Sequence, residues 1–298
     1  ATANSVNTVY AQLNILATPK ATSKVAKAAG VQSEVPANYG NVFGTASVHV
    51  LEMANAYATI AAQGKAATPY FVKAAKSPDG AFDYTAKPEV TTAFDADLMA
   101  DTTFAMQAVV QRGSGKTASS IGRPLAGKTG TTSDNKAAWF NGFAPQLATA
   151  VGIYRPGPNG EELEMKNVAG LREVTGATLP VSIWTAYMKV ALQGLDVVQF
   201  PKPAYVLQTL RLPGATRDEL LVTHTESAAI WLLAGNSDGS LGVQGQVTNR
   251  AVHSLRSGRI RTTNGPPDLV TAHRDLDTVD VLPGIAAPAH FSSEAVQF

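Results

Sequence analysis

The sequence predicts an α+β fold in which helices pack on an antiparallel sheet. Segments with helical periodicity lie within the first 110 residues, short apolar segments with a period of two follow between 123 and 156, and a last helical segment comes after them. Separate runs of helices and strands are typical of α+β domains. The length of 298 residues and the 45% hydrophobic content are enough for one large domain or two smaller ones.

Four helices are expected before the sheet, over residues 8–16, 19–28, 51–61 and 95–110. Pro19 stands where a first helical turn accepts proline, and Gly30 lies just beyond the end of that helix. Gly64 and Gly113 follow the third and fourth apolar patterns as stop signals. These glycines and the proline therefore set the expected boundaries.

The strands are expected in three consecutive segments, "RPLAGKTGTT", "KAAWFNGFAP" and "LATAVGIYRP". The turn sequences "TSDN" and "PQ" separate them, so we expect an antiparallel meander. A closing helix, "LPVSIWTAYMKVALQG", starts near Pro180 and is expected to lie on that sheet.

Composition excludes several classes of function. A formal net charge of +1 with 16% charged residues gives no field that would attract nucleic acid or an acidic lipid surface. The chain has no cysteine, and no His, Asp and Glu cluster has ligand spacing, so we expect neither metal nor organic cofactor. No apolar run is long enough to cross a membrane, and the start at Ala1 and Thr2 has neither Met nor signal peptide, which indicates an N-terminal truncation.

The character of the sequence changes beyond Pro203. All thirteen lysines lie at or before Lys202, whereas four of the five histidines lie at or after His224. We place a boundary near Ala204, so that residues 1–204 form the recognisable domain and 205–298 form an unassigned tail. Its Gly-rich, Ser-rich and polar runs predict poor order or loose packing. An altered reading frame over the tail is a second interpretation.

Two short motifs stand in a suggestive order. Ser5-Val6-Asn7 lies at the start of the first helix, and Lys128-Thr129-Gly130 lies on the first strand. Each is weak alone, because Ser5 and Asn7 also suit a helix cap and Lys128 suits a solvated strand edge. Ser-x-Asn, then more than a hundred mostly helical residues, then Lys-Thr-Gly on a strand is the order found in serine penicillin-recognising enzymes.

Longer stretches make the resemblance specific. "YGNVFGTASVHVLEMANAYATIAAQGK", "VVQRGSGKTASSIGRPLAGKTGTTSDNKAAWFNGFAP" and "FPKP" resemble the transpeptidase domain of a class A penicillin-binding protein, the bifunctional type that builds peptidoglycan. The resemblance implies the penicillin-binding transpeptidase fold, shared with serine β-lactamases. It also implies a place on the extracytoplasmic face of the bacterial membrane, through an N-terminal anchor that this chain lacks.

The substrates implied are the D-Ala-D-Ala end of a peptidoglycan stem peptide and β-lactam antibiotics, so the site must hold a carboxylate and an oxyanion. Lys128 supplies positive charge, and Thr129 and Thr131 offer hydroxyls to the carboxylate. Gly130 has no side chain, which lets a substrate backbone lie along the strand edge. We therefore expect substrate to bind at Thr129, Gly130 and Thr131.

By the same resemblance, the catalytic residues in this chain are Ser5, Asn7 and Lys128. Lys128 and Ser5 would pass a proton to the leaving amine, and Asn7 would bind the substrate amide. The backbone N–H of Thr131 would form half of the oxyanion hole.

The nucleophile is the missing part. The family acylates a serine in a Ser-x-x-Lys motif upstream of Ser-x-Asn, and the one match here, Ser133 to Lys136, spans the turn between two strands. Because no helical face brings that pair together, we expect the nucleophile on an absent segment and no activity from this chain alone. Three functions stay open: a D,D-transpeptidase fragment, a non-catalytic D-Ala-D-Ala or β-lactam sensor, and a D,D-carboxypeptidase or β-lactamase.

Overall fold

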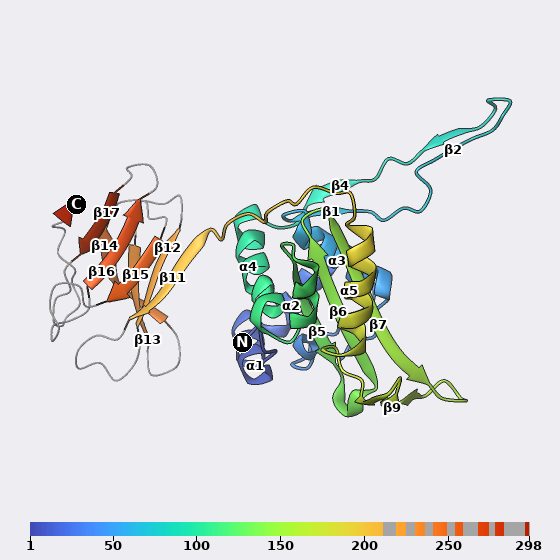
Figure 1. Ribbon diagram of the computed structural model, residues 1–298, viewed down its shortest axis with the longest axis horizontal. Coiled ribbons are helices and arrows are strands. Elements are labelled where there is room, and N and C mark those ends of the chain that lie inside the picture. Colours follow the sequence, from blue (N-terminus) through green and yellow to red (C-terminus); the bar gives the residue numbers. More distant parts are fainter. Residues whose placement is uncertain are drawn as a thin grey trace. The chain divides into compact units, whose positions relative to one another are not determined.

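A computed structural model describes residues 1–210 and, beyond them, the strand segments 219–224, 230–235, 241–248, 254–258, 268–273, 278–282 and 296–297. The chain divides into two compact units, residues 1–202 and 203–298. Each unit is described separately below. Figure 1 shows the elements of both.

The first unit contains the five helices and three long strands that the sequence predicts, together with several short strands that it does not. The helices are α1 (Asn7–Ala17), α2 (Pro19–Ala29), α3 (Val50–Ala61), α4 (Ala96–Arg112) and α5 (Leu179–Ala191), with short 3-10 turns η1 (Asn41–Phe43), η2 (Lys116–Ile121) and η3 (Ser133–Asn135). The strands are β1 (Lys65–Ala67), β2 (Ala74–Lys76), β3 (Asp83–Thr85), β4 (Val90–Thr92), β5 (Ala126–Thr131), β6 (Ala137–Ala144), β7 (Leu147–Pro156), β8 (Glu162–Leu163), β9 (Lys166–Val168) and β10 (Leu171–Glu173).

The main sheet has the order β5-β6-β7-β8, and all of its pairs are antiparallel. The predicted meander is therefore confirmed. Strand β5 lies at one edge of this sheet, with Lys128 opposite Asn141 and Gly130 opposite Trp139 on β6.

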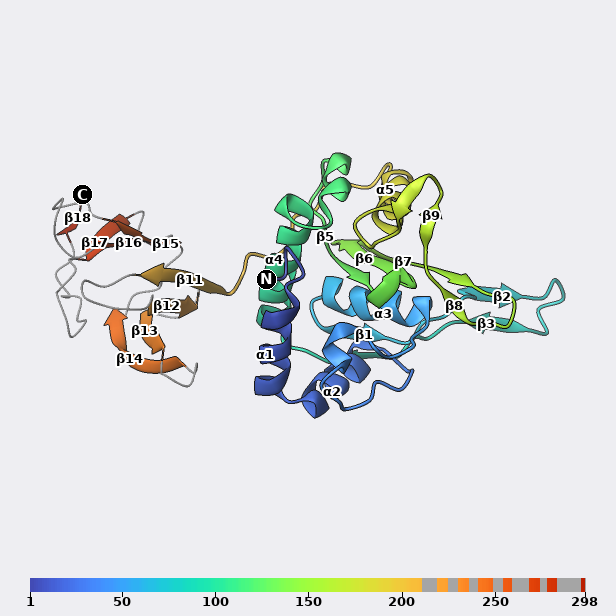
Figure 2. The same ribbon diagram turned by 90° about the horizontal axis from the view of Figure 1, so that it is seen from below.

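Helices cover both faces of the sheet, as Figure 2 shows for α3 and α5 on either side of β6 and β7. On the α5 face, Phe140 meets Trp184 edge to face at 5.1 Å between ring centroids, and both side chains are fully buried. On the α3 face, Phe143 meets Tyr57 in the same manner at 6.3 Å. Phe140 and Phe143 face opposite sides because they lie three residues apart on one strand. The unit is thus a helix, sheet and helix arrangement, and the predicted α+β class is confirmed.

The segment between α3 and α4 forms an extended arm that the sequence reading missed. Strands β1 and β4 pair at its base, and β2 and β3 pair farther out, away from the sheet (Figure 1). Each of these strands has only three residues, and most of their side chains are exposed. Such short exposed strands carry no period-two apolar pattern by which they could be recognised.

The second unit begins at Pro203, and the assignment of residues 205–298 as a separate tail stays a prediction. Its described residues form two four-stranded antiparallel sheets. One contains β11 (Tyr205–Leu210), β12 (Glu219–His224), β13 (Ile230–Gly235) and β14 (Leu241–Thr248), and the other contains β15 (Ser254–Gly258), β16 (Asp268–His273), β17 (Thr278–Leu282) and β18 (Val296–Gln297). Loose packing of the tail stays a prediction.

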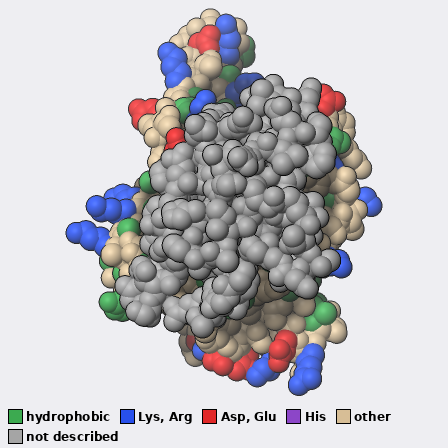
Figure 3. All heavy atoms as spheres, turned by 90° about the vertical axis from the view of Figure 1, so that its left-hand side faces the viewer, with side chains coloured by type: hydrophobic (Ala, Val, Ile, Leu, Met, Phe, Trp, Pro, Cys, Tyr) green, Lys and Arg blue, Asp and Glu red, His purple; other side chains and the backbone are tan. Residues whose placement is uncertain are grey.

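Two features are absent from the described residues. No helix there is long and apolar enough to cross a membrane, and no group of three or more His, Asp or Glu side chains is placed to hold a metal ion. Basic and acidic side chains both appear on the visible part of the described surface (Figure 3), in keeping with the net charge of +1.

Candidate active site

Ser5 and Lys128 meet in the structure although 123 positions separate them in the sequence. The Lys128 ammonium donates a hydrogen bond to the Ser5 hydroxyl, with 2.6 Å between Nζ and Oγ. It also donates to the Thr129 carbonyl oxygen at 2.9 Å. The two motifs that the sequence analysis paired therefore lie within hydrogen-bond distance of each other.

Lys128 is a half-buried cation on the edge strand β5, not a solvated edge lysine. Its two hydrogen-bond acceptors, the Ser5 hydroxyl and the Thr129 carbonyl, are both neutral. Desolvation by burial lowers the pKa of Lys128 to about 8. A partly desolvated ammonium with neutral acceptors is a position that a bound anion would stabilise.

Ser5 is held in an unusual backbone conformation just before α1. Its φ of 54° lies in the left-handed region, which costs a residue with a side chain about 1–2 kcal/mol. Val6, not Ser5, occupies the N-cap position of α1, and no side chain caps this helix. The helix-cap interpretation of the Ser5 hydroxyl therefore fails, and the strained turn points that hydroxyl at Lys128 instead.

Asn7 is the first residue of α1 and its side chain is exposed. It follows Ser5 by two residues, so the same turn places both. Its contact with a substrate amide stays a prediction.

Thr129 follows Lys128 on β5 and is only 9% exposed. Its hydroxyl shares a hydrogen bond of 2.7 Å with the hydroxyl of Ser114. The backbone N–H of Ser114 in turn donates to the carbonyl of Ala3 at 2.9 Å. Ser114 therefore connects β5 to the segment that carries Ser5.

Gly113 allows this connection. A Cβ at Gly113 would overlap the carbonyl group of Ala3, so any other residue would push the N-terminal segment away. The sequence analysis assigned Gly113 only as a helix stop and gave Ser114 no role. The phrase "RGSG" directly after a long helix was the one available signal, since paired glycines indicate close backbone approach.

Gly130 and Thr131 both contact residues from other parts of the chain. The base of the Trp139 side chain packs against Gly130, whose added Cβ would be 3.3 Å from the Trp139 Cβ. The Thr131 hydroxyl accepts a hydrogen bond from the N–H of Gly176 at 3.0 Å. Gly130 therefore has a packing role besides the substrate role expected for it, and substrate binding at both residues stays a prediction.

Ser133 and Lys136 lie in the connection between β5 and β6, as expected from "TSDN". Ser133 begins the three-residue turn η3, inside which Asp134 has a φ of 60° that is not helical. No α-helical face joins the two side chains there, so the local geometry offers nothing that would activate Ser133.

The arrangement can be compared with known proteins. A model of the penicillin binding protein transpeptidase domain matches residues 1–168, more than half of the chain. The chain belongs to the penicillin-binding protein transpeptidase family. Ser5 and Lys128 both lie within the matched range.

Individual relatives point to the class A branch of the penicillin-binding proteins. The chain is 37% identical over 178 residues to penicillin-binding protein 1A of Mycolicibacterium smegmatis, an alignment that spans 57% of this chain and 22% of the relative. The solved structure of PonA1 from Mycobacterium tuberculosis aligns with a TM-score of 0.53 and 33% identity, over 62% of this chain and 53% of that one. PonA1 solved in complex with penicillin V aligns over the same shares at 31% identity and a TM-score of 0.52.

These likenesses confirm the expected family and its fold. The chain spans about a fifth of the length of the curated relative named above. Residues 1–168 match the transpeptidase domain of this family and are similar to penicillin-binding proteins of the 1A type, and cell-wall synthesis is the process to which that family belongs.

Proposed function

We propose that this chain is part of a peptidoglycan D,D-transpeptidase that works through an acyl-serine intermediate and is inhibited by β-lactams. The hydrogen bond between Lys128 and Ser5 carries the proposal. It joins a half-buried ammonium to a hydroxyl held in a strained turn, and both belong to motifs of the family.

The first task is recognition of a carboxylate. A donor stem peptide ends in the carboxylate of its last D-alanine, and a β-lactam carries a carboxylate beside its ring. Lys128 attracts that group because burial deprives its ammonium of water while its present acceptors are neutral oxygens. A bound carboxylate raises the pKa of Lys128 again, so charge on the ligand keeps the lysine protonated.

The second task is proton delivery. Attack of the nucleophilic serine on the carbonyl between the two D-alanines breaks the C–N bond, and the departing amine needs one proton. The Ser5 hydroxyl donates that proton and takes another from Lys128 Nζ, 2.6 Å away, and the proton that the nucleophilic serine loses in the attack balances the one that the amine gains. Asn7 holds the substrate amide, and the Thr131 N–H shares the oxyanion with the N–H of the nucleophile.

The nucleophile itself is assigned to a Ser-x-x-Lys segment outside residues 1–298. The one such spacing in this sequence, Ser133 to Lys136, lies in a turn. Fluorescent penicillin is therefore expected to leave the chain as written unlabelled on a denaturing gel. A labelled band that disappears in Ser133→Ala would contradict this part of the proposal.

The whole protein would act on the extracytoplasmic face of the cell membrane. Its reaction with stem peptides provides the decisive test. The complete protein, with its Ser-x-x-Lys segment, is incubated with a pentapeptide ending in D-Ala-D-Ala and an amine acceptor. The proposal expects D-alanine release together with a cross-linked product. Release without cross-linking would favour a D,D-carboxypeptidase, and binding without release would favour a non-catalytic sensor.

A further inference from the structure

Ser114 forms hydrogen bonds to both of the segments that build the site, one through its backbone and one through its side chain. Its N–H donates to Ala3, two residues before Ser5, and its hydroxyl meets the hydroxyl of Thr129, the residue after Lys128. It stands just past the end of α4, and the sequence analysis gave it no catalytic or binding role. Its position therefore affects the strand and the N-terminal turn together.

The direction of the hydrogen bond between the Ser114 and Thr129 hydroxyls decides which proton stays free for a ligand. A threonine hydroxyl has one proton to donate and two lone pairs to accept with. Either oxygen of the Ser114 and Thr129 pair can be the donor in the free site. If Thr129 donates to Ser114, its proton is used up within the protein and its oxygen presents only lone pairs to a substrate carboxylate, which repels them.

Recognition of a carboxylate by Thr129 therefore requires the opposite direction. Ser114 must donate to Thr129 Oγ1, so that the single Thr129 proton is free for the carboxylate. Thr129 is 9% exposed, so little water is present to replace Ser114 as the donor. The 2.7 Å separation is the usual distance for such an O–H···O bond.

We propose that Ser114 is a positioning residue that directs the Thr129 hydroxyl proton toward the carboxylate of the bound substrate. The proposal rests on the function proposed above. It predicts that loss of the Ser114 hydroxyl weakens the recognition of ligands that carry the carboxylate. The recognition of ligands in which that group is neutralised should stay nearly unchanged.

The experiment uses the complete, nucleophile-bearing protein with two probes, penicillin G and its methyl ester. Acylation by each is measured by stopped-flow, so that the dissociation constant of the initial complex and the acylation rate constant are separated. Ser114→Ala removes the donor, Ser114→Thr restores a hydroxyl, and Thr129→Val removes the acceptor. Ser120→Ala is the matched control, because its exposed hydroxyl bonds to the Thr117 carbonyl on η2, away from β5.

Ser114→Ala is expected to weaken the reaction of the acid by about three- to tenfold, as for the loss of one neutral hydrogen bond, and to change the reaction of the ester by less than about twofold. Ser114→Thr restores most of the loss. Adding Ser114→Ala to Thr129→Val produces little further loss, since both act on one proton.

An equal loss with acid and ester would overturn the proposal, because it would mean that Ser114 only holds the fold. No loss with either probe would overturn it as well. If Ser114→Ala does not fold, the same two probes are used with Thr129→Val and Ser114→Thr. The expected result is then a loss limited to the acid in Thr129→Val and little loss with either probe in Ser114→Thr. Failure of the proposed function looks different: the unsubstituted protein would not be acylated, or Lys128→Ala would leave acylation unchanged.

Discussion

Replacement of Lys128 by alanine in the complete protein tests the role of the half-buried ammonium. The change removes the cation that would meet the substrate carboxylate and the proton donor to Ser5, at 2.6 Å. A charge-assisted contact in a partly desolvated site contributes about 2–4 kcal/mol to the transition state, which corresponds to roughly 30- to 1000-fold in rate. We expect a loss in that range in the second-order rate constant of acylation by a β-lactam.

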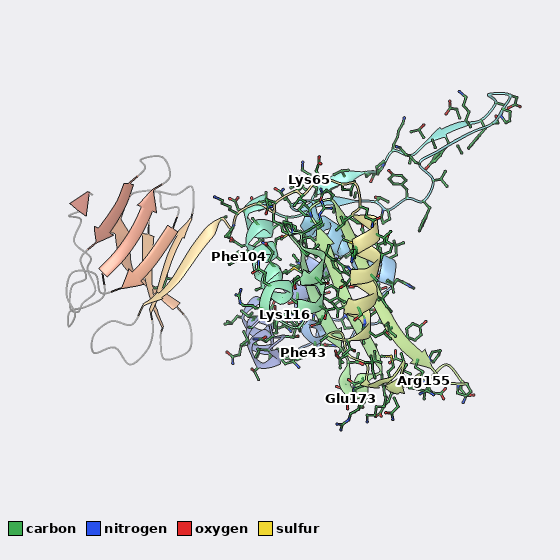
Figure 4. The ribbon with its side chains drawn as sticks, in the orientation of Figure 1. Phe43, Lys65, Phe104, Lys116, Arg155 and Glu173 are labelled. Carbon is green, nitrogen blue, oxygen red and sulfur yellow. The ribbon has the colours of Figure 1, made fainter. Side chains whose placement is uncertain are left out.

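Lys116→Ala is the control for a loss of positive charge alone. Lys116 is exposed on η2, before β5 (Figure 4), and its loss should change the rate by less than about threefold, as for most surface substitutions. Thermal unfolding of both variants separates an effect on the site from one on the fold. A smaller loss at Lys128 than at Lys116 would refute the reasoning and place the active site on another element.

Three further outcomes follow from the same geometry. The rate of acylation should fall as pH rises through about 8, because burial lowers the pKa of Lys128 to that value and the protonated form is needed. The pH–rate profile of Lys128→Arg should lack this inflection. Gly113→Ala should slow acylation by more than about tenfold and destabilise the first unit by about 1–3 kcal/mol, because the added Cβ would displace Ala3. Stopped-flow acylation measures the first effect, and denaturant unfolding measures the second. Trp184→Ala should cost about 3–5 kcal/mol in denaturant unfolding, since the indole is fully buried and donates to Thr149.

The elements that the sequence predicted are those with strong periodicity and clear boundary residues. Helix α2 begins at Pro19 and has Gly30 at its left-handed C-cap, and α4 ends at Arg112 directly before Gly113. The meander was predictable because three apolar segments alternate with short turns. The arm between α3 and α4 was not, because its three-residue strands are exposed and paired only with each other.

Only the residues within the two motifs of the site were predictable from the sequence. Order along the chain was enough to pair Ser5 with Lys128, and the contact between them exists. The bond between Ser114 and Thr129 joins two segments that no local pattern relates. The close approach of the Trp139 Cβ to Gly130 likewise depends on the register of β5 and β6, which the sequence does not specify residue by residue.

The central claim is that Ser5 and Lys128 act as one proton-delivering unit. A double-mutant cycle on acylation by penicillin in the complete protein tests it most directly, with Ser5→Ala, Lys128→Ala and the double variant. The account predicts that the double variant is about as slow as the slower single variant, because either change alone interrupts the same path. Independent effects, in which the two rate losses multiply, would contradict it.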